Sequence, residues 1–451
     1  MDQASLYNPK CETIPRDELR QLQFERLQST LNRVYRNVAF YKAAFDSHRV
    51  NLERITDLQA LQELPFTTRE DLQRSYPYDM FAVPLRDIVR IHTTSGTSGK
   101  GTPPHDMATG GPKPIVVGYT QNDLRNWREC AARLLTAAGV TQHDVVQIAL
   151  HYSLFAEGFG FHQGAERVGA SVIPASLATG VAKQIVVMRD FKTTVLVSTP
   201  SHALNIAVSL DEAQVSLERL SLRLGLFSGE RWSDPLRRQL EERLRINSID
   251  TYGPTEVMGP GVAGECHLRH GLHINEDQFL VEVVDPKTHA PVPDGHEGEL
   301  VLTTIMKEGF PLIRYRTGDI TRLNPEPCPC GRTFLRMAPV CGRTDDLVLV
   351  RGVGFFPSQI EGILAECDGV SPYFQIILDQ EGGVETVQIR VEIADDIQSL
   401  DKVKAIETLR LEAARRIQTV LDIETKVILL EPGSLRRLPG GAERVVDRRP
   451  G

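Results

Sequence analysis

Hydrophobic and polar positions follow two different periods along the chain. Apolar residues recur at helical spacing over residues 15–48, which predicts a helical N-terminal segment. From residue 121 to about 245, helix-like segments alternate with short apolar runs such as VVQIAL and TTVLVSTP. This alternation predicts parallel βαβ units and therefore an α/β domain.

The pattern changes twice in the second half of the chain. Past residue 265, the runs FLVEVVD and ELVLTT and a turn-rich link between them predict a smaller, more antiparallel β region. Past residue 345, strands alternate with the helix PSQIEGILAEC and with a longer amphipathic helix over 399–421. The apolar face of that longer helix comprises Leu400, Val403, Ile406, Leu409, Ile417 and Val420. We therefore expect a large α/β N-terminal domain over residues 1–344 and a small α+β C-terminal domain over 345–451.

Composition and charge exclude several classes of protein. Of the 451 residues, 41% are hydrophobic and 24% charged, which is ordinary for a globular chain. The formal charge of -8 does not favour non-specific nucleic-acid binding, and no apolar run approaches the ~18 residues that a membrane span needs. The N-terminal residues lack the pattern of a secretory signal. Seven irregularly spaced cysteines favour a reducing compartment, so we expect a cytoplasmic protein. From the charge and the absence of a long apolar run, we expect no nucleic-acid or membrane partner.

A run rich in Gly, Ser and Thr, TTSGTSGKG at 93–101, is the first candidate for chemistry. Gly96 and Gly99 let the backbone approach a ligand closely, and the N–H groups, the hydroxyls and Lys100 can donate to phosphate oxygens. The spacing is not that of a Walker loop. By composition alone, the run is also typical of a flexible surface linker.

Seven motifs in order give the sequence a family resemblance. They are TSGTSGK at 94–100, SGE at 228–230, DTYGPTE at 250–256, RYRTGD at 314–319, CPCGR at 328–332, GRTDDLVLVRGVGFFPSQIE at 342–361 and RVVDRR at 444–449. Together they resemble the adenylate-forming (acyl-CoA synthetase) superfamily, and within it the phenylacetate-CoA ligase-like aryl-CoA ligases. The resemblance extends from about Leu19 to about Arg449.

The resemblance implies an AMP-forming aryl-acid:CoA ligase that uses ATP, Mg²⁺ and CoA. The loop would hold the leaving phosphates, Glu256 would hold Mg²⁺, Thr255 would lie near the α-phosphate, and Asp345 would be the hinge between domains. The loop residues are Ser95, Gly96, Thr97, Ser98, Gly99 and Lys100. The residues implied around the adenine and ribose are Ser228, Gly229, Glu230, Thr251, Tyr252, Gly253, Asp319 and Arg343. Taken singly, Asp319 after a glycine and the run Tyr252-Gly253-Pro254 are also typical of turns.

The resemblance implies less about the acid and the thiol. Arg351 and Gly352 would face the CoA channel, and the segment 151–169 would supply a wall of the aryl-acid pocket. Its candidate residues are Tyr152, Phe155 and Gly158, although aromatic residues there are equally typical of core packing. The acid is a phenylacetate, benzoate or anthranilate type, and its identity stays open.

Two departures from the family pattern affect the predicted activity. Eleven residues, GTPPHDMATGG, follow Lys100, so either Lys100 or Lys113 is the candidate for the lysine of the loop, and the insertion itself is predicted to be a mobile flap. Gly441 stands where the family has an adenylating lysine, with Arg444 or a loop lysine as a substitute. One alternative is an adenylate-forming enzyme that loads an acyl-carrier protein or nucleotidylates another acid. The other, which Gly441 motivates, is a non-catalytic binder of acyl-adenylate or nucleotide. The oligomeric state is open, and a homodimer is compatible with the sequence.

Cysteine and histidine residues predict a structural metal site. Cys328 and Cys330 lie on one tight turn, and by resemblance Cys266 and His273 complete a Cys₃His set suited to tetrahedral Zn²⁺. His267 and His270 compete as ligands from the same stretch. A disulfide and unliganded thiols are the alternatives.

Overall fold

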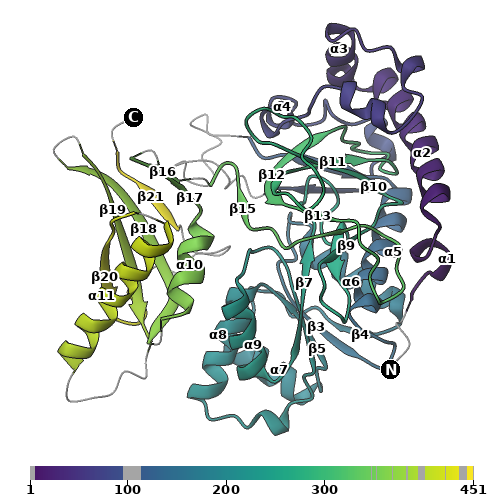
Figure 1. Ribbon diagram of the computed structural model, residues 1–451. Coiled ribbons are helices and arrows are strands. Elements are labelled where there is room, and N and C mark those ends of the chain that lie inside the picture. The colour runs from purple at the N-terminus through teal and green to yellow at the C-terminus, as the bar shows by residue number, and fades with distance from the viewer. Residues whose placement is uncertain are drawn as a thin grey trace. The chain divides into compact units, whose positions relative to one another are not determined.

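The computed structural model describes residues 6–94, 113–346, 348–351, 353–367, 369–381, 384–394, 402–421, 423–435 and 444–449 (Figure 1). The chain divides into two compact units. The first comprises the described parts of Met1–Thr97, Pro103–Gly229 and Arg243–Val340, and the second those of Glu230–Glu242 and Cys341–Gly451. Among the described residues, none of the helices combines the length and apolarity that a bilayer crossing needs.

The first unit begins with helices that precede any of its strands. They are α1 (Pro9–Glu12), α2 (Arg16–Asn37), α3 (Ala39–Ser47), η1 (Leu52–Arg54), η2 (Gln59–Glu63), α4 (Arg69–Arg74) and η3 (Leu85–Asp87). The helical segment predicted over 15–48 is confirmed as two helices, α2 and α3, separated at Val38, which has extended φ and ψ of -116° and 107°. Val34, Val38 and Tyr41 are all buried in the same hydrophobic core. Apolar residues therefore recur at helical spacing across Val38, and the sequence pattern does not show the break.

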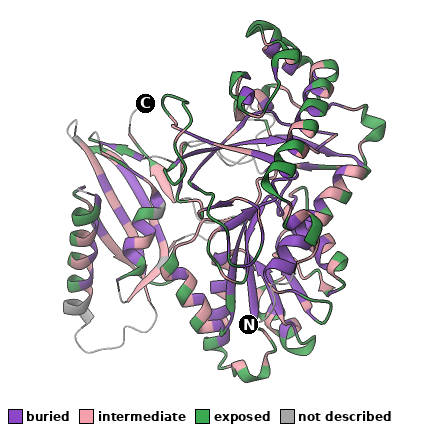
Figure 2. Ribbon diagram, turned by 45° about the vertical axis from the view of Figure 1, so that its right-hand side comes forward, coloured by how far each residue is buried: buried purple, intermediate pink, exposed green. Residues whose placement is uncertain are grey.

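A nine-stranded sheet forms the centre of the first unit (Figure 1). Its parallel part consists of β3 (Val145–Ala149), β4 (Ser171–Ile173), β5 (Val195–Ser198), β6 (Leu224–Phe227) and β7 (Asn247–Tyr252). The antiparallel strands β8 (Ala263–Glu265), β9 (Leu272–Ile274), β14 (Arg336–Met337) and β13 (Leu323–Asn324) extend it beyond β7. The predicted α/β organisation is therefore confirmed, and Figure 2 shows that the strands of this sheet are largely buried.

The helices that precede or connect these strands in the chain are α5 (Gln121–Ala137), α6 (Glu157–Val168), α7 (Val181–Asp190), α8 (Pro200–Glu212), η4 (Leu217–Arg219) and α9 (Asp234–Leu244), and most of α9 belongs to the second unit. Local sequence explains where several of them begin or end. Thr120 and Asp123 form a capping box that starts α5, and Gly169, with a φ of +93°, ends α6. In α8, the Thr199 hydroxyl accepts the His202 N–H at 3.2 Å.

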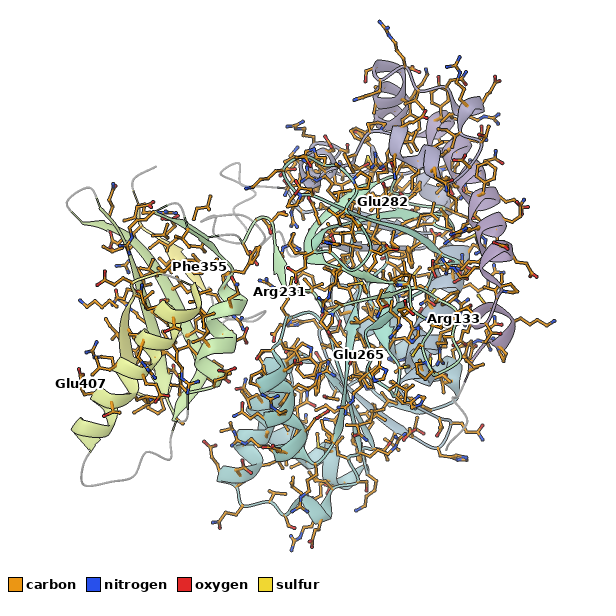
Figure 3. All side chains as sticks on the ribbon, in the orientation of Figure 1. Arg133, Arg231, Glu265, Glu282, Phe355 and Glu407 are labelled. Atoms are coloured by element: carbon orange, nitrogen blue, oxygen red, sulfur yellow. The ribbon has the colours of Figure 1, made fainter. Side chains whose placement is uncertain are left out.

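Two smaller sheets complete the first unit. β1 (Arg90–Thr93) pairs antiparallel with β2 (Val116–Tyr119), and β10 (Phe279–Val284), β11 (Gly298–Thr304) and β12 (Tyr315–Thr321) form the predicted antiparallel region. One partly buried and one buried ion pair join these parts of the first unit. Arg314 donates to Glu282 at 2.8 Å, and Arg133 of α5 donates to Asp277 at 2.6 Å (Figure 3 labels Arg133 and Glu282).

The second unit has its own sheet and hydrophobic core. β18 (Val370–Glu381) pairs antiparallel with β19 (Val384–Ile393), and β20 (Lys426–Leu430) and β21 (Val445–Asp447) flank them in parallel. Helices α10 (Pro357–Ala365) and α11 (Lys402–Leu421) pack against this sheet, which is the predicted α+β arrangement (Figure 1). The unit also contains β15 (Gly342–Arg343), β16 (Val348–Val350) and β17 (Val353–Phe355).

The apolar face predicted for α11 is only partly buried. Leu409 and Ile417 belong to the core of the second unit, whereas Val420 is 63% exposed. Val420 was therefore wrongly predicted as a core position, because it lies three residues from Ile417 but in the last turn before the helix ends at Leu421. Leu400 lies outside the described residues.

Candidate active site

The carboxyl ends of the parallel strands gather the predicted functional segments at one edge of the sheet. Strand β3 leads into the segment from 151, β6 into Ser228, and β7 into Gly253. Crevices at this edge are the usual ligand sites of open α/β sheets. Thr251 joins two of these ends, because its hydroxyl donates to the Phe227 carbonyl at 2.8 Å.

Two motifs distant in sequence meet at the end of β7. The Tyr252 hydroxyl donates a hydrogen bond to Asp319 Oδ2 at 2.6 Å. Asp319 is buried within β12, so the alternative that it is a turn residue is wrong. The arrangement brings the predicted adenine and ribose residues of DTYGPTE and RYRTGD together.

A tight loop follows β7. The Pro254 carbonyl accepts the N–H groups of Val257, Met258 and Gly259 at 3.0–3.1 Å. A Cβ atom at Gly253 would lie 1.8 Å from the Gly259 carbonyl oxygen, so only glycine fits there. Thr255 is half-buried in this loop, and Glu256, next to it, is buried.

The Glu256 carboxylate has two polar neighbours. The Tyr315 hydroxyl donates to Glu256 Oε1 at 3.3 Å, and Arg69 Nη1 of α4 lies 3.6 Å from the same oxygen. Arg69 comes from the N-terminal helices, and no sequence motif pointed to it. The Tyr315 hydroxyl thus orients the carboxylate that is predicted to hold Mg²⁺, and the Arg69 guanidinium group partly balances its negative charge.

The SGE motif follows β6. Ser228 is buried, and its N–H donates to the Ser198 carbonyl at 3.1 Å. Gly229 has a φ of +81°, and a Cβ atom there would lie 2.8 Å from Glu157 Oε1. Glu157, the first residue of α6, is therefore a neighbour of the predicted nucleotide residues that the sequence analysis missed. Glu230 belongs to the second unit.

The predicted wall of the aryl-acid pocket is a compact aromatic cluster. Tyr152 packs edge-on against Phe159 with ring centroids 5.3 Å apart, and its hydroxyl shares a hydrogen bond with His162 Nδ1 at 3.1 Å. Phe155 contacts His151 at 5.8 Å between ring centroids. A Cβ atom at Gly158 would lie 2.6 Å from the His151 carbonyl oxygen, so this glycine permits a close backbone approach.

His92 links this wall to β1, and the sequence analysis missed it. His92 Nδ1 bonds to the Leu154 carbonyl at 3.1 Å, and the Thr93 N–H donates to the same carbonyl at 2.8 Å. Burial lowers the pKa of His92 to about 4, so the ring is neutral near pH 7. Its position directly before TTSG was the available signal.

Most of the phosphate-type loop lies outside the described residues. Ser95, Gly96, Thr97, Ser98, Gly99, Lys100 and the insertion at 101–111 lie outside the described residues. Lys113 is described, and its ammonium group lies 5.4 Å from the centroid of the Tyr76 ring.

The second unit contains the remaining predicted residues. Arg343 donates to Asp345 through Nε and Nη2 at 2.8 and 3.0 Å, so two predicted residues pair with each other. The Arg351 N–H donates to Glu385 at 2.6 Å. Gly352 and Gly441 lie outside the described residues.

Arg444 was the candidate substitute for the missing lysine. Its guanidinium group pairs with Glu361 of α10 at 2.5 and 3.1 Å and lies 5.2 Å from the centroid of the Phe374 ring. The arginine is therefore already engaged by a carboxylate within its own unit.

The predicted metal ligands form one buried cluster. The ligand atoms of Cys266, His273, Cys328 and Cys330 all lie within 4.8 Å of one another. Cys330 Sγ lies 3.5 Å from His273 Nε2, and the sulfurs of Cys266 and Cys328 are 4.0 Å apart. The cysteines are not in disulfides, so the disulfide alternative is wrong for the described structure.

The electrostatics of the cluster favour one thiolate. A hydrogen bond with Cys266 and the His273 ring lower the pKa of Cys330. The same bond and burial raise the pKa of Cys266, and burial raises that of Cys328. His273 Nδ1 is buried and has no hydrogen-bond partner within the part of the chain that the structure describes.

Comparison with known families identifies the two halves of the chain. The sequence pattern of the AMP-binding enzyme family matches residues 25–306, and that of the AMP-binding enzyme C-terminal domain matches residues 352–449. The chain belongs to the AMP-binding enzyme family. Both units of this AMP-binding enzyme therefore have counterparts in the family, and the predicted resemblance is confirmed.

Two relatives of this AMP-binding enzyme match nearly its whole length. It is 40% identical over 457 residues to a phenylacetate-coenzyme A ligase of Thermus thermophilus, covering 98% of this chain and 100% of the relative. It is 41% identical over 439 residues to a phenylacetate-coenzyme A ligase of Pseudomonas putida, covering 97% and 96%.

A solved structure agrees with the fold of this AMP-binding enzyme. The 2-hydroxyisobutyryl-CoA ligase in complex with 2-HIB-AMP, in its postadenylation state, matches with a TM-score of 0.89 and 27% identity. The match covers 99% of this chain and 93% of that one. The predicted adenylate-forming fold, with a large N-terminal and a small C-terminal domain, is therefore confirmed.

Proposed function

We propose that this protein is an AMP-forming aryl-acid:CoA ligase. It would join an aromatic carboxylate to ATP with release of pyrophosphate, and then pass the acyl group from AMP to the thiol of CoA. The two full-length relatives, both phenylacetate-coenzyme A ligases, support this reaction class. The structural observation that carries the proposal is the hydrogen bond between Tyr252 and Asp319, which joins two nucleotide motifs at the ligand edge of the sheet.

The nucleotide is assigned to this edge. Asp319 would accept hydrogen bonds from the ribose hydroxyls, and the Tyr252 hydroxyl would orient the carboxylate for them. Ser228, Gly229 and Thr251, which are held together at the ends of β6 and β7, would line the adenine and ribose. Glu230, Gly253 and Arg343 keep their predicted nucleotide roles as parts of this proposal, as do Ser95, Gly96, Thr97, Ser98, Gly99 and Lys100 for the leaving phosphates.

Glu256 suits a magnesium ion that arrives with ATP. Mg²⁺ prefers oxygen ligands and is commonly bound through one or two carboxylates together with substrate phosphates. Because Arg69 offsets the Glu256 charge, we expect little Mg²⁺ binding without the phosphates. When bound, the ion would supply positive charge to the phosphate oxygens, with Thr255 beside the α-phosphate.

The acid, the thiol and the hinge are assigned by the family resemblance. The cluster of Tyr152, Phe155 and Gly158 would form an apolar wall beside the aromatic ring, and its close packing supports a rigid surface. Asp345 would be the hinge between a domain ending at residue 344 and the C-terminal domain. Arg351 and Gly352 would face the CoA channel.

The Cys₃His cluster would hold a structural Zn²⁺. A tetrahedral site with Zn–S bonds of about 2.3 Å places its sulfurs about 3.8 Å apart, close to the 4.0 Å between Cys266 and Cys328. The buried set of three soft thiol ligands and one imidazole supports the same assignment. All four ligands are buried, so the ion would stabilise the fold and not take part in the reaction.

A panel of aromatic acids tests the proposed function. The purified protein is incubated with ATP, Mg²⁺ and phenylacetate, benzoate, anthranilate or a hydroxybenzoate, with and without CoA, and pyrophosphate and CoA thioester are measured. We expect pyrophosphate release with at least one acid and thioester only with CoA. Transfer to an acyl-carrier protein in preference to CoA, or no AMP release with any acid, would support the two alternatives instead.

A further inference from the structure

The loop that follows β7 is anchored by side chains that donate to its carbonyl groups. We call residues 253–261 the β7 loop. The Val257 carbonyl accepts from Lys307 Nζ at 2.7 Å, Met258 from the Tyr119 hydroxyl at 3.0 Å, Pro260 from Trp127 Nε1 at 2.7 Å and Gly261 from Asn275 Nδ2 at 2.7 Å. These donors come from four separate parts of the first unit, so the loop has one well-defined position.

Lys307 is the amine of this set, and burial lowers its pKa to about 7 although the Asp123 and Glu256 carboxylates act in the opposite direction. It is only 4% exposed, and its ammonium group lies 4.2 Å from the centroid of the Tyr119 ring. Burying an ammonium group costs much more free energy than burying an apolar side chain of the same length. Packing alone therefore does not explain a lysine here, whereas a hydrogen bond to a buried carbonyl does.

The bond from Lys307 lies next to the proposed magnesium ligand. Val257 follows Glu256 directly, and Val257 is completely buried. The carboxylate of Glu256 is oriented by contacts with Tyr315 and Arg69. The Glu256 carboxylate and the backbone beside it are thus held from different elements, and among the four side-chain donors to the β7 loop Lys307 bonds to the carbonyl nearest to Glu256 in the sequence.

We infer that Lys307 is a positioning residue for the first half-reaction, because its bond to the Val257 carbonyl holds Glu256 where the carboxylate can receive the Mg²⁺ of Mg–ATP. Lys307 itself touches neither substrate nor ion. The inference rests on the proposed function, since that function assigns Mg²⁺ to Glu256. It goes beyond that function in naming a residue that no motif marks.

Removing the donor should move the loop. In Lys307→Met, the buried Val257 carbonyl loses its partner and the chain must shift to satisfy it. Because the shifted carboxylate no longer meets the ion in its preferred position, we expect the effect of Mg²⁺ on ATP affinity to fall by about tenfold or more.

Calorimetry of ATP binding with and without Mg²⁺ tests the inference independently of the acid substrate. Wild type, Lys307→Met and Lys307→Gln are compared with two controls. Lys183→Met makes the same change at an exposed lysine of α7, and Tyr119→Phe removes the neighbouring donor to Met258 without a change of charge. Thermal unfolding is measured for each, and thioester formation from a supplied acyl-adenylate is assayed without ATP.

The expected result has three parts. Mg²⁺ tightens ATP binding to the wild type and to Lys183→Met, but this effect falls at least tenfold in Lys307→Met. Tyr119→Phe loses about as much thermal stability as Lys307→Met, but the effect of Mg²⁺ on its ATP affinity changes less than in Lys307→Met. Thioester formation from the acyl-adenylate stays within about threefold of wild type, because that step does not use the positioned Mg²⁺.

The inference is overturned if a folded Lys307→Met keeps the wild-type Mg²⁺ effect, or if both half-reactions fall in parallel with stability. Should Lys307→Met not fold, Lys307→Gln decides: a Mg²⁺ effect reduced threefold or more supports the inference, and an unchanged effect overturns it. If Mg²⁺ does not affect ATP binding to the wild type, the assignment of the ion to Glu256 fails, and the inference fails with it. Wild-type pyrophosphate release is assayed separately and decides the proposed function.

Discussion

Replacing Cys330 by serine is expected to remove the metal and to destabilise the first unit. Cys330 Sγ lies 3.5 Å from His273 Nε2, at the centre of a ligand set whose atoms lie within 4.8 Å of one another. A ligand present at 1,000 times its dissociation constant stabilises a protein by about 4 kcal/mol. With a shift of about 2 °C per kcal/mol for a large domain, we expect a fall in Tm of about 8 °C.

The matched control is Cys341→Ser, which makes the same substitution at an exposed cysteine outside the cluster. Elemental analysis should find about one equivalent of zinc in the wild type and in the control, and much less in Cys330→Ser. A chelator should lower the Tm of the wild type to that of Cys330→Ser. The reasoning is refuted if the wild type contains no metal and Cys330→Ser is as stable as Cys341→Ser.

Two further predictions rest on individual contacts, and a third rests on the glycine at position 441. Tyr252→Phe removes the 2.6 Å bond that orients the Asp319 carboxylate. Because a bond to a charged acceptor contributes about 1.5–3 kcal/mol to stability, we expect the Tm to fall by about 3–6 °C and AMP to bind about tenfold more weakly; an unchanged affinity in calorimetry would contradict this role. Burial lowers the pKa of His92 to about 4, so as the pH falls from 6.5 to 4 the unfolded state binds a proton more readily and stability falls by up to about 3 kcal/mol. Urea unfolding should therefore show that the free energy of unfolding falls more steeply with decreasing pH in wild type than in His92→Phe. An equal pH dependence in the two proteins would contradict the prediction. Gly441→Lys should speed pyrophosphate release without changing thioester formation from a supplied acyl-adenylate, and Gly440→Lys is the control. If Gly441→Lys releases pyrophosphate no faster than wild type, a missing positive charge at this position does not limit adenylation.

Much of the fold follows from the sequence because apolar runs of strand length alternate with amphipathic segments. That alternation correctly predicts the parallel strands from β3 to β7 and the separate α+β unit. It does not show the break between two helices at Val38, where the apolar spacing continues, and it is wrong at Val420, where the spacing continues into an exposed final turn. The spacing of apolar residues indicates which side of a helix faces the core. It does not predict a single non-helical residue between two helices, or the residue at which the buried face of a helix ends.

The candidate site is predictable where motifs mark it and not where tertiary packing makes it. The motifs correctly bring Tyr252 and Asp319 to one place, and they bring the Cys₃His residues into one cluster. No local pattern predicts that Arg69 of an N-terminal helix lies beside Glu256, or that Lys307 bonds to the Val257 carbonyl. These contacts join segments far apart in the chain, and they depend on how the first unit packs around the β7 loop.

The position of the nucleotide is the central claim of this account. A crystal structure of the wild-type protein with AMP or an acyl-adenylate bound tests it most directly. We predict that the ribose hydroxyls lie within hydrogen-bond distance of the Asp319 carboxylate and that the adenine lies beside the ends of β6 and β7. A nucleotide bound elsewhere, with Asp319 still bonded only to protein groups, would contradict the account.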